Sequence, residues 1–298
     1  MSALMPGWIR DDREVEKVWG RMPTPYFATP SPEDKDAFNH LIFKDYTGDW
    51  HDEGPQKIGD CVSWGNSRLV DYTCVLEAAS LSVPDAYVFE RTATEVLYAL
   101  MRIDVGKGQI RGDGGVGAWA AEAMTKFGTI SRKRLDELGV GGTYSGDRAR
   151  QWGSQGLPSN LHPEAILHTV EDCTPVRTFN EFAWHAQQGR VTAVCSNVGF
   201  ENGSNGTTQR DADGFATPRG EWGHCMTLVS ARMGKRPGGL LCNQWPKGCV
   251  VGPNGPCDIP PCSWWVDAHV IDGMLAQNDS FTATKYKGYP ARKLTWRF

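Results

Sequence analysis

The chain has 298 residues, of which 40% are hydrophobic and 22% charged, values that are ordinary for a globular protein. A chain of this length can bury a large core, as one elaborate domain or as two small ones. The net charge of −4 gives no electrostatic reason to expect nucleic acid, and no apolar stretch approaches the roughly 18 residues of a membrane span.

The first half of the chain carries helical patterns. Residues 1–53 are polar and contain prolines, and we interpret them as an extended leader that wraps the domain. Apolar residues then recur at helical spacing over 62–79, 92–101 and 116–127. These patterns predict a helical lobe over about 54–135, in which the glycine-rich turn 111–115 precedes the third helix.

The second half changes character. Short helices are predicted at 163–170 and 178–188, and runs of β-forming residues predict strands at 191–195, 225–230, 240–242, 263–266 and 280–286. Residues 175–298 therefore form a predicted β-rich lobe. With the helical lobe it completes a domain over 54–298, and the fold class is α+β with two lobes.

One segment of the first half has the residues of a cysteine nucleophile. Gln56 and Cys61 lie five positions apart, just before the predicted helix over 62–79. A thiol at a helix N-terminus lies at the positive end of the helix dipole, which favours the thiolate. A nearby side-chain amide can donate a hydrogen bond to an oxyanion.

Two later segments supply the partners of such a thiol. His224 opens one predicted strand, and Asn243 ends the next, followed by Gln244 and Trp245. An imidazole can hold a cysteine as thiolate and protonate a leaving amine. The asparagine side-chain oxygen can fix the imidazole tautomer. Neighbouring strands would bring both residues to one edge of a sheet, facing the thiol.

In this order the motifs resemble those of the papain-like cysteine peptidases, in particular bacterial and phage-type members without a propeptide. The resemblance covers residues 54–250, about two thirds of the chain. It implies an antiparallel β-sheet or barrel lobe and a central helix that starts at the cysteine. The site residues that it implies are Cys61 as nucleophile, His224 as general acid and base, Asn243 as the residue that orients the histidine, Gln56 in the oxyanion hole, Trp245 as a shield of the His–Asn bond, and Gly114 and Gly115 as partners of the substrate backbone.

The sequence departs from the family pattern at three places. Gln56 lies five residues before Cys61, where the family has six. Val62 and Ser63 separate Cys61 from Trp64, so an alignment on the tryptophan would place Ser63 at the nucleophile position. Pro246 stands where a glycine is usual. These departures affect the oxyanion-hole assignment more than the Cys–His pair.

The resemblance implies a cysteine-type peptidase that hydrolyses polypeptide substrates through a thioester, without a cofactor or a metal. One alternative is an inactive papain-fold component of a larger assembly such as a phage particle. Another is a cell-wall amidase, because Asp60 and Cys61 are similar to the motif of the NlpC type, and a third is acyl transfer.

The remaining predictions concern the location of the protein and its cysteines. The start of the chain lacks the apolar core of a signal peptide, so we expect a cytoplasmic protein at synthesis, virion-associated under the phage alternative. The nine cysteines are then expected to be mostly reduced. A zinc site among the cysteines 242–262 is disfavoured because they lack Cys-x-x-Cys spacing. Asn278-Asp279-Ser280 fits the glycosylation pattern and is interpreted as a polar loop.

Overall fold

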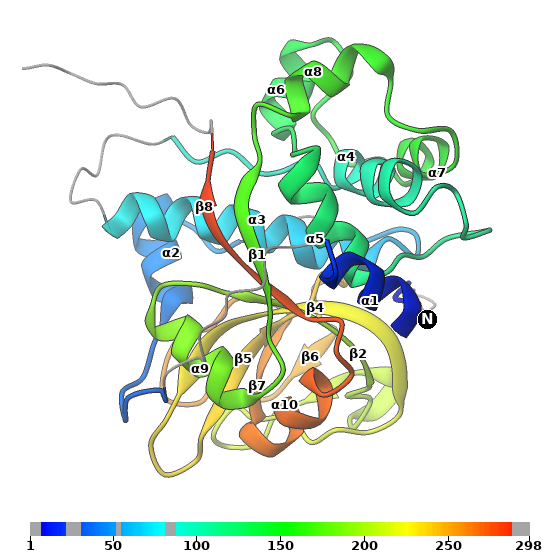
Figure 1. Ribbon diagram of the computed structural model, residues 1–298. Coiled ribbons are helices and arrows are strands. Elements are labelled where there is room, and N and C mark those ends of the chain that lie inside the picture. Colours follow the sequence, from blue (N-terminus) through cyan, green and yellow to red (C-terminus); the bar gives the residue numbers. More distant parts are fainter. Residues whose placement is uncertain (1–6, 22–30, 52–54, 81–87, 288–298) are drawn as a thin grey trace, which may run out of the picture.

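The computed structural model describes residues 7–21, 31–51, 55–80 and 88–287. Its helices and strands are segregated: most helices of the first half lie together above a six-stranded sheet built by the second half (Figure 1). The α+β class with two lobes is confirmed by this arrangement.

The central element of the helical part is α3 (Cys61–Ser80). Almost all of its side chains are buried, which is expected of a helix that is enclosed on every side. It packs against α2 (Asn39–Thr47), α4 (Thr94–Ala99) and α5 (Gly117–Lys126), and its other face meets the sheet. The predicted helix over 62–79 is therefore confirmed, with its start at the cysteine.

The other helices of this part differ more from the predictions. The predicted helix over 92–101 continues past α4 as a π-helix, η2 (Leu100–Val105). The predicted helix over 163–170 is wrong in its second half: the helix ends early, the carbonyl of His168 accepts from Thr129 N at 3.0 Å, and a strand begins at Val170. The remaining elements here are α6 (Arg132–Glu137), α7 (Gly146–Gln155), η3 (Ser159–Leu161) and α8 (His162–Ala165).

The sheet is antiparallel throughout, in the order β1-β8-β2-β4-β5-β7. The five predicted strands are all present. The strand bounds are β1 (Val170–Pro175), β2 (Thr192–Val198), β4 (Glu221–Arg232), β5 (Gly238–Cys242), β7 (Ser263–Asp267) and β8 (Phe281–Tyr286), and β3 (Thr208–Gln209) pairs separately with β6 (Val250–Val251).

Strand β4 is buried on both faces, which explains its continuous apolar run. Cys225 and Val229 belong to the core shared with the helical part. Met226 and Leu228 point the other way, into a second core that includes residues of α9 (Phe179–Gln187) and α10 (Ala268–Leu275). Strand β4 therefore lies between the two cores, and His224 near its start lies between them as well.

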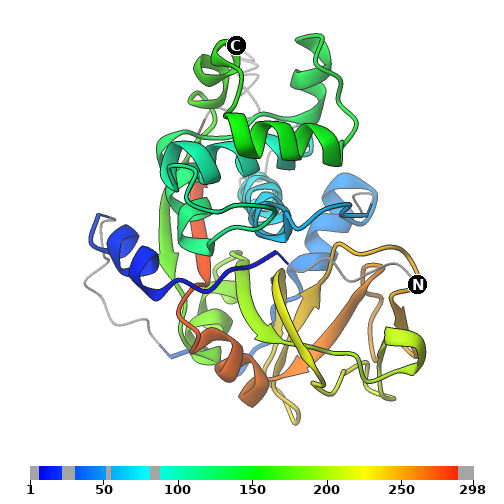
Figure 2. The same cartoon turned by 90° about the vertical axis from the view of Figure 1, so that its right-hand side faces the viewer.

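Although an extended leader was expected over residues 1–53, the described N-terminal residues are not extended throughout. They contain α1 (Asp12–Trp19), whose N-terminus is capped by the Asp11 side chain, and α2. Before α1, residues 7–9 run between the helical part and the sheet, as the blue segment in Figure 2 shows. Within the described ranges, no helix is both long and apolar enough to cross a membrane.

Candidate active site

Cys61 is the first residue of α3 and is fully buried. Burial raises the pKa of its thiol well above the ordinary value, although hydrogen bonds from the backbones of Cys225 and Gly7 oppose that shift. The helix dipole predicted a thiolate, and this prediction is wrong for the structure described here. Desolvation outweighs the helix terminus because the sulfur has no access to water.

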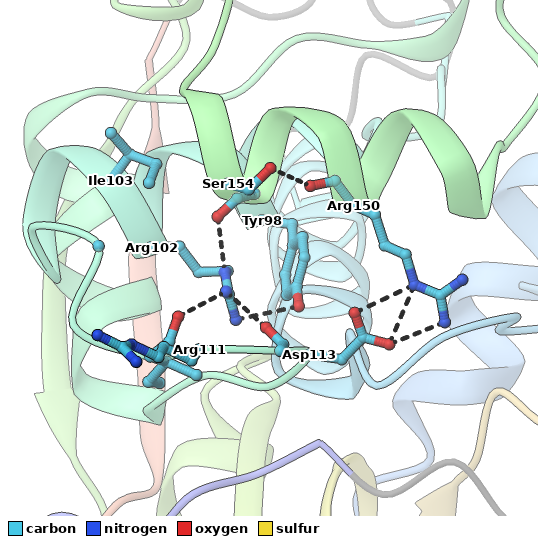
Figure 3. Close-up of a pocket in the computed structure, with 11 residues that line it drawn as sticks. Tyr98, Arg102, Ile103, Arg111, Asp113, Arg150 and Ser154 are labelled. Carbon is cyan, nitrogen blue, oxygen red and sulfur yellow. Dashed lines mark hydrogen bonds and ion pairs between the residues drawn. The ribbon is translucent and has the colours of Figure 1, made fainter.

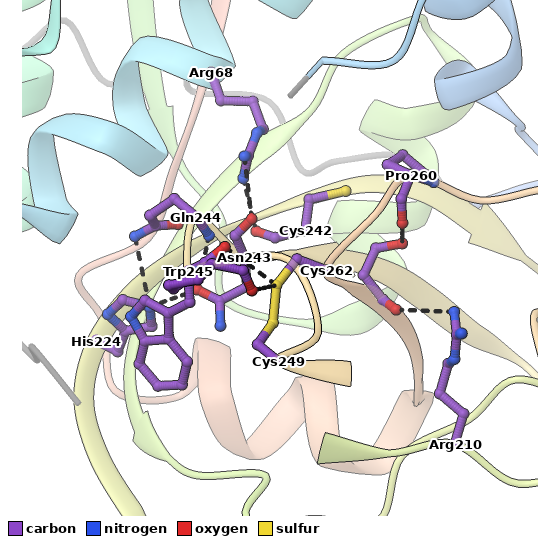
Figure 4. Close-up of a disulfide and its surroundings, with 12 residues drawn as sticks. Arg68, Arg210, His224, Cys242, Asn243, Gln244, Trp245, Cys249, Pro260 and Cys262 are labelled. Carbon is purple, nitrogen blue, oxygen red and sulfur yellow. Dashed lines mark hydrogen bonds between the residues drawn. A yellow bond between two sulfur atoms is a disulfide. The ribbon is translucent and has the colours of Figure 1, made fainter. Parts of the chain in front are cut away.

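His224 and Asn243 form the predicted pair at the edge of the sheet (Figure 4). His224 Nε2 lies 2.9 Å from Asn243 Oδ1, and both residues are buried. Asn243 Oδ1 also accepts from Gln244 N at 2.8 Å, which identifies this atom as the oxygen. Because the oxygen only accepts, a neutral His224 carries its proton on Nε2 and leaves Nδ1 as the basic nitrogen.

The second ring nitrogen of His224 faces away from Asn243. Its Nδ1 is buried and has no hydrogen-bond partner among the described residues. Burial lowers the pKa of His224 to about 4, although the bond to Asn243 opposes the shift, so the ring is neutral at pH 7. No hydrogen bond joins it to Cys61 within the described chain. The two residues nevertheless share one location, since Cys225, next to His224, hydrogen-bonds to the Cys61 sulfur.

The ring of Trp245 covers the histidine. It stacks on that of His224, with centroids 4.7 Å apart and an interplanar angle of 29°. Trp222 packs edge-on against Trp245 at 4.6 Å. The apolar rings keep water from the hydrogen bond between His224 and Asn243.

Gln56 lies at the site, but its side-chain amide is engaged within the protein. Its Nε2 donates to Ile58 O at 2.6 Å, and its Oε1 accepts from Gln244 Nε2 at 3.3 Å. The Gln244 side-chain amide also donates to Cys225 O at 2.9 Å, and the main-chain carbonyl of Gln244 accepts from Gln56 N at 3.0 Å. Gln244 thus ties the segment before Cys61 to the strand that carries His224. Gln244 lies within the motif formed by Asn243 and Trp245, but no role of its own was predicted for it.

A buried network that the sequence did not reveal supports the Asn243 turn. Arg68 of α3 donates to Cys242 O at 2.9 Å and to Asn243 O at 3.2 Å. Its Nε donates to His51 Nδ1 at 3.4 Å, and His51 Nε2 lies 2.7 Å from Asp71 Oδ2. The chain of bonds requires a neutral His51 that donates to the Asp71 carboxylate. The central helix therefore holds the backbone of the turn directly.

The same turn is fixed from its other side by a disulfide. Cys249 and Cys262 are bonded to each other, and the other seven cysteines are free (Figure 4). The carbonyl of Cys262 accepts from Asn243 N at 3.0 Å. Most cysteines are reduced, as expected, but this cross-link was not predicted. Among the residues that the structure describes, no cluster of His, Cys, Asp and Glu could hold a metal.

Gly114 and Gly115 lie in a loop that is anchored by Arg102 of η2 (Figure 3). Beside this loop is a pocket of about 630 Å³. π-Helical turns are often found near functional sites, and here the turn carries the arginine that organises the loop. Its guanidinium donates five hydrogen bonds of 2.6–3.2 Å, to Gly153 O, Tyr98 Oη, Gly114 O, Ile110 O and Gly112 O.

The surface between this loop and His224 is occupied by residues 7–9, which we call the covering segment. Gly7 N and Trp8 N donate to Gly223 O at 2.9 and 2.8 Å. Ile9 N donates to Gly115 O at 2.9 Å, and Gly115 N donates to Gly7 O at 2.8 Å. The covering segment therefore pairs with the backbone that was predicted to pair with substrate, and a family member without a propeptide was not expected to hold such a segment.

Two glycines allow this close approach. A methyl group on Gly7 would lie 2.0 Å from Gly59 O, two residues before Cys61. Gly114 has φ of +126°, and a methyl group there would lie 2.7 Å from the Ile9 side chain. At Gly7 the close neighbour is backbone, so a larger residue requires a backbone shift; at Gly114 the positive φ disfavours a larger residue, and the Ile9 side chain would have to move. Gly7 is thus fitted against the start of α3.

No family model and no curated relative matches the chain. Among solved structures it is similar to xylellain, a cysteine protease from Xylella fastidiosa, with 14% identity and a TM-score of 0.61 over 94% of this chain and 96% of that chain. It is also similar to procathepsin B S9 from Trypanosoma congolense, with 10% identity and a TM-score of 0.57 over 95% and 87% of the two chains.

A further similar structure is digestive procathepsin L 3 of the Tenebrio molitor larval midgut, with 13% identity and a TM-score of 0.51 over 89% of this chain and 74% of that chain. The chain therefore has the papain-like fold, with the central helix beginning at Cys61, as the resemblance of its motifs predicted.

Proposed function

We propose that the protein is a cysteine peptidase that hydrolyses peptide bonds with Cys61, His224 and Asn243. The observation that carries the proposal is the bond between His224 Nε2 and Asn243 Oδ1. It leaves Nδ1 of the neutral ring buried and without a hydrogen-bond partner among the described residues. The peptidase fold of the similar structures supports the same class of reaction.

In the proposed reaction, His224 Nδ1 takes the proton of the Cys61 thiol as the sulfur attacks the peptide carbonyl carbon. The imidazolium then donates this proton to the leaving amine, and a thioester to Cys61 remains. Water attacks the thioester with His224 again as the base, which releases the acid and restores the thiol. Asn243 keeps the ring oriented in both steps.

Two parts of the site have to move before this reaction. The covering segment pairs with Gly115, so a peptide can bind there only after the segment is displaced. The Gln56 amide has to turn from Ile58 O before it can join the Cys61 backbone N–H in stabilising an oxyanion. The structure described here is, in this proposal, the covered resting state.

The test uses the full chain with Gly7→Ala, which disturbs the covering segment, and mass spectrometry of casein digests. We expect cleavage by this variant and at least about a 10³-fold loss when Cys61→Ala is added, because no other group replaces the nucleophile. Cys74→Ala is the matched control, since Cys74 is another buried cysteine of α3.

The alternatives predict other outcomes of the same test. A cell-wall amidase would release amino groups from peptidoglycan and leave casein intact. An inactive component of a larger particle would show neither reaction, and a peptidyl epoxide would fail to label Cys61 in any variant. Transfer of the acyl group to an added amine, in preference to water, would indicate acyl transfer.

A further inference from the structure

Three buried cysteines meet where α3 packs on the sheet, and the proposed reaction uses only one of them. They are Cys61 at the start of α3, Cys225 on β4 and Cys195 on β2. All three are free, at most 1% of each is exposed, and they belong to one hydrophobic core. Two thiols with no assigned role therefore accompany the proposed nucleophile.

Cys225 is held against α3 beside Cys61. Its main-chain N–H hydrogen-bonds to the Cys61 sulfur. Its own sulfur packs on Gly65, where a methyl group would lie 2.8 Å from it. Gly65 follows Cys61 by four residues, so both residues lie on the same face of the helix, one turn apart. Glycine is unfavourable inside a helix, and here the missing side chain leaves room for the Cys225 sulfur next to Cys61.

Cys195 faces Cys225 across two paired strands. The two residues are direct partners in the antiparallel pairing of β2 with β4, and their thiols are hydrogen-bonded to each other. Directly opposite residues of such strands have Cα atoms about 4.5–5.5 Å apart, which is within the range of about 4.4–6.8 Å that a disulfide spans. The register therefore places Cys195 and Cys225 within reach of a disulfide.

A cysteine nucleophile that a base activates is open to oxidation. Hydrogen peroxide converts a thiolate to a sulfenic acid, and further peroxide takes it irreversibly to the sulfinic acid. A neighbouring thiol prevents the second step, because it condenses with the sulfenic acid to a disulfide that can be reduced. Cys225 has this position relative to Cys61. Burial raises the pKa of Cys195 well above its ordinary value, and its bond to Cys225 adds to the shift, so Cys195 does not compete for peroxide.

We propose that Cys61, Cys225 and Cys195 form a thiol relay, in which Cys61 reacts with hydrogen peroxide and the two strand cysteines take over its oxidation as a disulfide. The relay goes beyond the proposed function and shares with it only His224 as the base of Cys61. It returns the nucleophile to its thiol form after an oxidation. Hydrogen peroxide is the one reactant that comes from outside the protein.

The relay consists of three steps. His224 Nδ1 takes the Cys61 proton, the Cys61 sulfur bonds to one peroxide oxygen, and the O–O bond breaks; the departing hydroxide receives the proton and leaves as water. The Cys225 sulfur then bonds to the Cys61 sulfur, and the sulfenic hydroxyl leaves as water with the Cys225 proton. Last, the Cys195 sulfur displaces Cys61 from this disulfide, and its proton passes to Cys61. Peroxide is reduced by two electrons, which come from Cys195 and Cys225.

The first experiment maps disulfides in the full chain carrying Gly7→Ala, which disturbs the covering segment. The protein is treated with a small excess of hydrogen peroxide, denatured with N-ethylmaleimide and digested without reduction for mass spectrometry. We expect a new disulfide between Cys195 and Cys225, with Cys61 recovered as the alkylated thiol. With Cys195→Ala added, a disulfide between Cys61 and Cys225 should accumulate instead, because the last step is blocked.

Two outcomes of this mapping would contradict the relay. A digest without any disulfide among the three cysteines would overturn it, even if no Cys225 variant folds. A disulfide between Cys61 and Cys225 that is the same with and without Cys195 would overturn the step to Cys195.

The second experiment measures how far Cys225 protects Cys61. When Cys225→Ala is added to the Gly7→Ala chain, the share of Cys61 found as sulfinic acid after peroxide should rise at least about tenfold, because no thiol resolves the sulfenic acid. Cys173→Ala is the matched control. It removes another buried free cysteine of the same core, whose partner across the strands is Ala283, and it should leave that share unchanged. Equal shares with and without Cys225 would contradict its role.

The relay and the proposed function fail separately, because the relay is measured from the masses of cysteine-containing peptides and not from cleavage of a substrate. Casein cleavage by the Gly7→Ala chain without a disulfide between Cys195 and Cys225 would overturn the relay and leave the proposed function in place. That disulfide without any casein cleavage would instead contradict the proposed function and leave the relay established.

Discussion

The two sides of the candidate site are held in different ways. On the sheet side, His224 is fixed by Asn243, Trp245 and a turn that Arg68 and a disulfide anchor from opposite directions. On the helix side, Cys61 is buried beneath Gly7, which belongs to a segment held by backbone hydrogen bonds and by the buried Trp8 side chain. In the proposed reaction, His224 is already oriented, whereas Cys61 becomes accessible only when the covering segment is displaced.

The largest effect on kcat should come from removing the hydrogen bond that orients His224. Asn243→Ala removes the acceptor of His224 Nε2–H and lets the ring turn, so kcat of the Gly7→Ala chain should fall about 10²-fold with a smaller change in KM. Asn197→Ala, at the exposed end of β2, is the matched control and should leave kcat intact. An unchanged kcat in Asn243→Ala would contradict the role of Asn243.

A second prediction concerns the support behind Asn243. Arg68→Met removes the buried cation that donates to the carbonyls of Cys242 and Asn243. The same change leaves His51, and through it Asp71, without the Arg68 guanidinium. The free energy of unfolding should fall by about 3 kcal/mol, measured by urea unfolding. Arg68→Lys keeps the charge but loses the forked geometry, so its loss should be intermediate.

The control for this loss is Arg150→Met. Arg150 is exposed and pairs with Asp113, and such surface pairs contribute about 0–1 kcal/mol. Equal losses in Arg68→Met and Arg150→Met would show that the buried network does not support the turn.

The smallest expected effect is a dependence of stability on pH at the helix side. Burial raises the pKa of Asp60, next to Cys61, to about 8, although its hydrogen bond from Tyr144 opposes the shift. The folded state therefore binds this proton more tightly than the unfolded chain. The resulting stability is present below about pH 4 and is lost as pH rises through about 8.

Thermal unfolding between pH 4 and pH 9 measures this contribution of Asp60 to stability. Asp60→Asn should flatten the decline of Tm toward pH 9, because the amide does not ionise. His224 has the opposite sign. Its pKa is lowered to about 4, so its contribution is lost as pH falls from about 6.5 through 4, and Asp60→Asn should leave that acid limb unchanged. A decline toward pH 9 as steep as in the wild type would contradict the assignment to Asp60.

The sequence predicted the parts of the molecule that local pattern encodes. The helix that starts at Cys61 and the strand that carries His224 contain long apolar runs, because both elements are buried on almost all sides. Asn243 and Trp245 were predicted because they follow a strand in a recognisable motif. Each of these features depends on residues within a short stretch of chain.

The features that sequence did not predict depend on residues far apart. Arg68 contacts Asn243 across 175 positions, and Trp8 contacts Asp279 across 271. Burial also reversed a local argument, because the dipole of α3 favours a Cys61 thiolate and desolvation opposes it more strongly. Gly7 carries no pattern at all, and its importance appears only when Gly59 O lies against it.

The most direct test of the account measures how fast a peptidyl epoxide labels Cys61 in the full chain at pH 7. Gly7→Ala should label at least about tenfold faster than wild type, because its methyl group would displace the covering segment from Gly59 O. Gly20→Ala, whose methyl group would have ordinary contacts of 3.5 Å or more, should label at the wild-type rate, and Cys61→Ala should not label. Equal rates in Gly7→Ala and wild type would contradict the claim that residues 7–9 cover a reactive cysteine.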